Sequence, residues 1–146
     1  MAIAPAPLEM QRLNALLSSL PESSSIEPGS ARSLAQAARS ALTIGRPDDA
    51  VDLGRAALAL EPKNARAWSV VGDALYAKGA VHDARIAYEE AVALDDKDLA
   101  TAVACARAQI GDGAPTAGKA LLSFVLMKSP SEELTRLATE LMDAAQ

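Results

Sequence analysis

The chain has 146 residues, of which 50% are apolar and 23% charged, a composition typical of a globular domain of ordinary size. Its formal net charge of −5 and its pI of about 4.8 argue against a nucleic-acid partner, because the summed field repels phosphate backbones. Cys105 is the single cysteine, which excludes an intrachain disulfide and favours a reducing compartment, so we expect a cytoplasmic protein.

Residues 1–30 are expected to hold an amphipathic helix followed by a linker. Residues 21–30 are rich in Pro, Ser, Glu and Gly, which is typical of a linker. The apolar face of the helix can cap the rest of the chain, pair with a second copy, or lie on a membrane surface. The membrane alternative is the weakest, because the polar face offers only Arg12 against Glu9. The residues of the apolar stripe are Met10, Leu13, Leu16, Leu17 and Leu20.

Three glycines, Gly45, Gly79 and Gly113, follow one another at intervals of 34 residues, the period of a helix-turn-helix repeat array. A repeat of this kind cannot bury its own apolar face, so successive units must stack into a solenoid. We divide the array into three units, residues 31–64, 65–98 and 99–132. Six helices are predicted, at residues 31–44, 48–60, 65–78, 82–94, 99–110 and 115–128.

Turn residues and small residues recur in the same register. Pro47 and Pro115 each stand two residues after a shared glycine, where proline suits the first turn of the second helix. Asp98 is expected to cap the first helix of the third unit. Small residues also recur at the two places where the helices of one unit must touch. They are Ala38, Gly72 and Ala106 at the first place, and Ala50, Ala84 and Gly118 at the second.

One more helix is predicted after the six repeat helices. It is a C-terminal capping helix that closes the array, assigned to residues 133–146. The pattern Ser129-Pro130-Ser131-Glu132 resembles a capping box, with Ser129 as the cap and Pro130 in the first helical position. One face of the helix is apolar, so it can cover the third repeat on one side only. That face carries Leu134, Leu137, Leu141 and Met142.

The middle unit carries Trp68, Gly72, Ala84, Tyr88 and Ala91, and Pro62 closes the unit before it. With these residues it resembles the tetratricopeptide repeat family, and the first and third units resemble that family less well. The third unit departs from the pattern, with Ala102 at a place that holds a large residue in the family and Gly118 at the place of an alanine. The resemblance implies an all-α fold, a helix-turn-helix solenoid of three repeats with a leading amphipathic helix and a trailing capping helix.

Members of this family bind extended peptides on the concave face, which the first helix of each repeat lines. The resemblance therefore implies a groove that is mixed apolar and basic, whose arginines either bind carboxylates of a ligand or simply keep exposed helix faces solvated. The lysine and asparagine clamp by which one subgroup holds a C-terminal carboxylate of heat-shock chaperones is absent. The expected groove residues are Arg32, Arg39, Leu42, Arg66, Asp73, Tyr76, Val103, Arg107 and Ile110.

No catalytic, metal-binding or cofactor-binding pattern is found in the sequence. His82 is the only histidine and is interpreted as a solvated turn residue, and Cys105 as a buried thiol. We therefore expect a non-enzymatic adaptor or scaffold that binds a peptide or helix of a partner protein.

A second reading rests on layout. Three repeats between a leading amphipathic helix and a trailing helix resemble the class II chaperones of bacterial type III secretion, which keep hydrophobic translocators soluble. Ala104, Cys105 and Ala106 stand near an alanine-cysteine segment of that family's third repeat. The resemblance implies a homodimer in which Leu13, Leu16 and Leu17 take part.

Overall fold

The computed structural model describes residues 7–21, 29–128 and 130–145, and within these ranges it contains eight helices and no strand. The predicted all-α solenoid is therefore confirmed, and the six repeat helices begin and end within about two residues of the expected positions. The helices are α1 (Pro7–Ser18), α2 (Ala31–Thr43), α3 (Pro47–Leu60), α4 (Ala65–Ala77), α5 (Val81–Leu94), α6 (Leu99–Gly111), α7 (Pro115–Met127) and α8 (Glu132–Ala144). None of these helices is long and apolar enough to cross a membrane.

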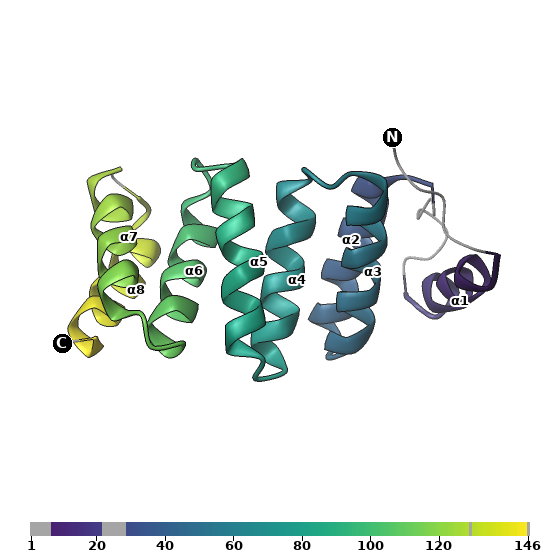
Figure 1. Ribbon diagram of the computed structural model, residues 1–146, viewed down its shortest axis with the longest axis horizontal. Coiled ribbons are helices and arrows are strands. Elements are labelled where there is room, and N and C mark those ends of the chain that lie inside the picture. Colours follow the sequence, from purple (N-terminus) through teal and green to yellow (C-terminus); the bar gives the residue numbers. More distant parts are fainter. Residues whose placement is uncertain (1–6, 22–28, 129, 146) are drawn as a thin grey trace.

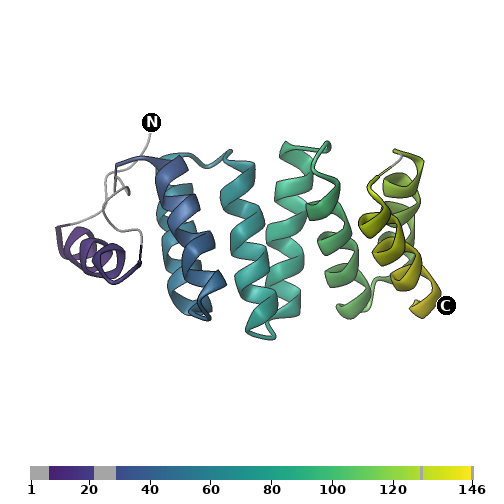
Figure 2. The same cartoon turned by 180° about the vertical axis from the view of Figure 1, so that it is seen from behind.

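The repeat helices form three pairs that stack in a row. Helix α2 packs on α3, α4 on α5, and α6 on α7, and each pair packs on the next. Figure 1 shows the pairs side by side, with α1 at one end of the row and α8 at the other. On one face α2 contacts α4, α4 contacts α6, and α6 contacts α8. Figure 2 shows this row from the opposite side. The first helices of the pairs, followed by α8, therefore form one continuous face of the solenoid.

The three periodic glycines all make the same turn between the helices of a pair. Gly45, Gly79 and Gly113 have φ of 81°, 83° and 85°, in the left-handed region that favours glycine. At each turn the glycine N–H donates to the carbonyl three residues before it, and the following N–H donates to the carbonyl five residues before it. For Gly79 these acceptors are Tyr76 O at 3.0 Å and Leu75 O at 2.9 Å. This bonding defines a Schellman motif, which satisfies carbonyls at the end of the helix.

The small residues allow the two helices of a pair to approach closely. At Gly72 on α4, an added Cβ would lie 2.7 Å from two ring carbons of Tyr88, which is fully buried on α5. At Gly118 on α7, it would lie 2.9 Å from the carbonyl oxygen of Ala106 on α6. Both contacts are shorter than a side chain tolerates. These positions therefore set the distance between paired helices.

The helix starts mostly follow the sequence signals. The side chains of Asn64 and Asp98 accept hydrogen bonds from Ala67 N and Thr101 N, and the predicted cap at Asp98 is confirmed. The predicted capping pattern places the first residue of the last helix at Pro130, two residues too early. Ser131 caps it, accepting from Leu134 N at 3.2 Å, and the helix begins at Glu132. Ser129, the expected cap, lies outside the described residues.

Helix α1 packs against the first pair, and its leucines join the main hydrophobic core. Leu13, Leu17 and Leu20 are buried in the same cluster as residues of α2 to α5, while Met10 and Leu16 are half-buried against it. A second cluster joins α6, α7 and α8, and Ala138 is its buried residue on α8. Each end helix thus covers an apolar surface that the neighbouring pair would otherwise leave in water.

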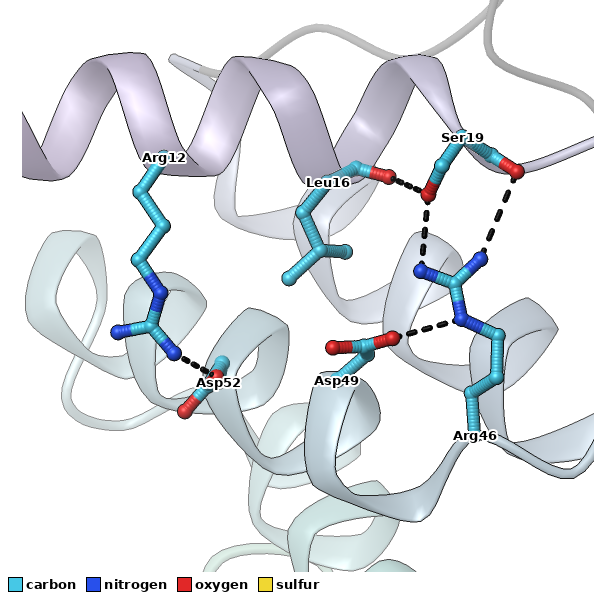
Figure 3. A network of polar contacts seen from close by, with 6 residues as sticks. All are labelled: Arg12, Leu16, Ser19, Arg46, Asp49 and Asp52. Carbon is cyan, nitrogen blue, oxygen red and sulfur yellow. Dashed lines mark hydrogen bonds and ion pairs between the residues drawn. The ribbon is translucent and has the colours of Figure 1, made fainter.

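Polar contacts at the rim of this core hold α1 to α3 (Figure 3). Arg12 pairs with Asp52 at 2.5 Å. Arg46 donates to Asp49 at 2.6 Å and to the Ser19 hydroxyl at 2.8 Å. The Arg12 side chain is 73% exposed, so its ion pair adds little to stability. The buried leucines are therefore expected to contribute most of the energy that holds α1 in place.

Candidate functional site: a groove along the first helices

A cavity of about 780 Å³ opens on the face built by α2, α4 and α6. Its charged lining contains three arginines and three aspartates, so the formal charges balance. The apolar part of the lining consists mainly of alanines, whose short side chains leave the space open. The residues that line it are Arg32, Ala35, Gln36, Arg39, Ala65, Arg66, Ser69, Asp73, Asp95, Asp98, Ala100, Thr101 and Ala104. We call it the first cavity.

The centre of the first cavity holds an ion pair between neighbouring repeats. Arg39 Nη1 on α2 lies 2.7 Å from Asp73 Oδ2 on α4, and the other oxygen of Asp73 accepts a hydrogen bond from the buried Tyr88 hydroxyl. Burial, followed by the nearby Asp73 charge, raises the pKa of Tyr88 above its ordinary value, so the phenol stays protonated and donates. Arg39 therefore already has a carboxylate partner within the chain.

A chain of hydrogen bonds forms the floor of the first cavity next to α6. Thr101 Oγ1 donates to Asp98 Oδ2 at 2.6 Å, so the Ser69 hydroxyl, 2.8 Å from Thr101, donates to it in turn. Ser69 and Thr101 are both buried. This chain ties α4 to α6 and fixes the carboxylate of Asp98 at the rim of the cavity.

A second cavity, of about 660 Å³, lies between α6 and α8. It shares Ala100 and Ala104 with the first, so the two cavities adjoin. Leucines and alanines dominate its lining. The residues that line this second cavity are Ala100, Val103, Ala104, Arg107, Glu133, Leu134, Leu137, Glu140, Leu141 and Ala144.

The guanidinium of Arg107 lies 4.0 Å above the ring centre of Tyr76, a cation–π contact between α6 and α4. Arg107 therefore also has an internal partner. Of the four arginines expected in the groove, Arg32 and Arg66 are exposed at the rim of the first cavity and appear in no ion pair found among the described residues.

Six of the nine expected groove residues line the two cavities. Arg32, Arg39, Arg66 and Asp73 line the first cavity, and Val103 and Arg107 line the second.

The other three expected residues, Leu42, Tyr76 and Ile110, line neither cavity. All three are half-buried; Leu42 and Tyr76 pack against the main core, and Ile110 packs against the second core cluster. A Cβ added at Gly118 would lie 2.6 Å from Ile110 Cγ1, so Ile110 points toward α7. The residues at this place in each unit therefore pack against the core clusters and do not line the cavities.

Four acidic groove residues were not expected from the sequence. Asp95 and Asp98, at the turn before α6, line the first cavity, and Glu133 and Glu140 on α8 line the second. A signal for the two aspartates was available, since the groove lies at the start of each first helix as well as along it. The glutamates depend on how α8 is rotated against α6, which the sequence does not specify.

The two residues considered and set aside as reactive groups lie away from the groove. Cys105 is buried, and burial raises the pKa of its thiol to about 12. His82 is exposed at the start of α5, with Nδ1 2.8 Å from Asp112 Oδ2. The hydrogen bond to Asp112 and its negative charge raise the pKa of His82. Cys105 is thus a residue of the core, and His82 is hydrogen-bonded to Asp112 at the surface.

The fold and the groove define a helix-turn-helix solenoid with a cavity-bearing face built from the first helices. Residues 35–99 match the family model described as the tetratricopeptide repeat. The resemblance of the middle unit to the tetratricopeptide repeat is therefore confirmed over these residues. Among curated proteins, none matches this sequence.

Solved structures with the same fold include proteins of several functions. The type III secretion translocator chaperone SycD of Yersinia enterocolitica superposes with a TM-score of 0.68 at 19% identity, over 79% of this chain and 90% of that one. The first repeat domain of Spaghetti (RPAP3), bound to an HSP90 peptide, gives 0.71 at 18%, over 82% and 95%. MamA gives 0.68 at 15%, over 98% and 94%. The TM-scores show that these proteins share the fold of this chain, and at such low identities the likeness shows the fold alone.

Proposed function

We propose that this chain is a non-enzymatic protein-interaction module that binds a peptide or helix of a partner protein in the two adjoining cavities. The observation that carries the proposal is the continuous hollow face along α2, α4, α6 and α8, with a combined lining of charged rims and apolar alanines and leucines. Such a surface suits a segment with alternating polar and apolar contacts. The Spaghetti domain bound to an HSP90 peptide and SycD bound to a YopD peptide support this use of the fold.

A peptide-display selection against the full chain tests the proposal. Arg66→Glu combined with Ala100→Trp places a reversed charge and a bulky ring on the exposed lining of the cavities. Arg55→Glu combined with Ala59→Trp makes the same changes at exposed positions of α3 that line neither cavity. We expect selected peptides to lose at least tenfold in affinity for the first variant and to keep it for the second. Equal binding by both variants would place the peptide site elsewhere.

A type III secretion chaperone of the class II kind is the alternative function. Its support is the likeness in fold to SycD, of which this chain spans 90%, and to SycD in complex with a peptide of the translocator YopD. The test is co-expression with hydrophobic secreted proteins encoded near this gene. A chaperone keeps such a client soluble and loses that ability with Arg66→Glu combined with Ala100→Trp. A client that is equally soluble without the chain contradicts this alternative.

Within one chain, the packing of α1 supports the cap more than the dimer helix. Leu13 and Leu17, which a dimer would use, are already buried against the first pair, and Leu16 is half-buried there. Light scattering across a range of concentrations distinguishes the two roles. We expect the 15.1 kDa mass of one chain throughout. A mass twice as large that returns to one chain with Leu16→Asp would support the dimer.

A further inference from the structure

The chemistry of the second cavity specifies the partner more narrowly than the fold does. Its walls are the apolar side chains of α6 and α8, including Val103 and the leucines Leu134, Leu137 and Leu141, which are only half-buried. When a ligand removes the remaining exposed surface of these leucines from water, the binding free energy becomes more favourable by about 25 cal/mol per Å² of apolar surface buried. The second cavity therefore favours apolar side chains of a partner.

The charges around the second cavity favour a basic partner over an acidic one, whereas those of the first cavity balance. In the first cavity three arginines face three aspartates, and Arg39 is already paired with Asp73. In the second, Arg107 is stacked on Tyr76, while Glu133 and Glu140 stand exposed on α8. Among the residues that the structure describes, Glu140 pairs with the exposed Arg136, at 3.2 Å. The whole chain adds a net charge of −5.

We infer that the second cavity binds a short apolar segment flanked by lysine or arginine, in a partner protein of the kind proposed above. From Leu134 to Ala144, α8 rises by ten steps of 1.5 Å, roughly 15 Å, which matches the length of four to five extended residues. The apolar residues lie between α6 and α8, and a basic flank pairs with Glu133. This inference rests on the proposed function.

Fluorescence polarisation with three synthetic heptapeptides tests this assignment on the full chain. The first peptide has the five-residue core Leu-Ala-Val-Leu-Ala with a lysine at each end. The second has the same core with a glutamate at each end. The third has a lysine at each end and a five-residue core made of Ser and Gln. We expect the first to bind at least tenfold more tightly than the other two, and its affinity to fall as salt is raised. Equal binding of the first and second, or of the first and third, overturns the inference.

Matched variants locate the site. Glu133→Lys is expected to weaken the lysine-flanked apolar peptide by about two- to fivefold, the range for an exposed ion pair, whereas Glu132→Lys, one residue earlier and outside the cavity lining, leaves it unchanged. Ala104→Tyr fills the junction of the cavities and is expected to reduce affinity at least tenfold. Its control is Ala120→Tyr, at an exposed position of α7 outside both cavities. Identical effects within either pair overturn the assignment.

The two proposals fail separately. If no heptapeptide binds, but display-selected peptides bind and are blocked by Arg66→Glu combined with Ala100→Trp, the assignment of the second cavity is wrong and the proposed function stands. If neither the heptapeptides nor any selected peptide binds in the groove, both are wrong.

Discussion

Gly72→Ala is a direct test of how closely the helices of one repeat must approach. The new Cβ would lie 2.7 Å from the Cδ1 and Cε1 atoms of Tyr88, a ring that is fully buried and also donates a hydrogen bond to Asp73. Replacing glycine inside a helix gains about 1 kcal/mol of helix propensity. Displacing the ring costs about 1–3 kcal/mol, and weakening its hydrogen bond to a carboxylate costs about 1.5–3 kcal/mol more. We expect a net loss of roughly 1.5–5 kcal/mol from these terms.

Urea denaturation of the full chain measures this loss, and two controls isolate its cause. At Gly111 an added Cβ meets only a methyl carbon of Val81, at 3.3 Å, so Gly111→Ala should change the free energy of unfolding by less than about 1 kcal/mol. Tyr88→Leu removes the ring, so the double variant with Gly72→Ala should be more stable than the two single losses predict, by about 1 kcal/mol or more. A Gly72→Ala variant as stable as the parent would refute the packing argument.

Three further predictions concern the turn, the thiol and the histidine. Gly79→Ala has free space for its Cβ but must adopt a φ of 83°, so thermal denaturation should show a loss of about 1–2 kcal/mol, and Gly79→Asn a smaller one; equal stability of all three would refute the role of the conformation. Because burial raises the pKa of Cys105 to about 12, a thiol-specific reagent at pH 8 should label it only after denaturation, and rapid labelling of the native chain would contradict this. The hydrogen bond to Asp112 and its charge raise the pKa of His82 above its ordinary 6.5. The stabilisation from the His82–Asp112 pair is therefore complete below pH 6.5 and is lost as the pH rises through the raised pKa. Urea midpoints at pH 6 and pH 8.5 should therefore differ more for the parent than for His82→Gln, and an equal difference would exclude this pair as a cause.

The sequence predicts the solenoid because its signals are local and recur. Each glycine makes the same turn, Pro47 and Pro115 open the helices that follow two of these turns, and Asp98 caps α6 as expected. Such signals depend only on residues within one turn of a helix end, so they can be read without knowing the tertiary structure. The start of α8 was misplaced because Ser129 and Ser131 offer two similar caps, and the choice depends on the packing of α8 against the third pair.

The cavities were only partly predictable, because their lining depends on contacts between helices. The alanines Ala100 and Ala104 join the two cavities, although each looks like an ordinary helix former in sequence. The acidic residues Glu133 and Glu140 enter the groove through the rotation of α8 against α6. A face expected to be apolar and basic thus has carboxylates opposite its arginines.

The 34-residue register of the repeats also predicts which groove residues lie next to one another. Arg39, Asp73 and Arg107 occupy the same position in successive repeats, and equivalent positions of stacked first helices lie next to one another. Opposite charges one period apart therefore predict an ion pair, which the structure contains between Arg39 and Asp73 at 2.7 Å. Because Asp73 pairs with Arg39, Arg107 has no carboxylate at this position of the register. Its guanidinium lies instead on the ring of Tyr76. In a repeat protein, charges should therefore be compared across one period before a groove is described by its net sign, because internal pairing removes charge that a ligand would otherwise meet.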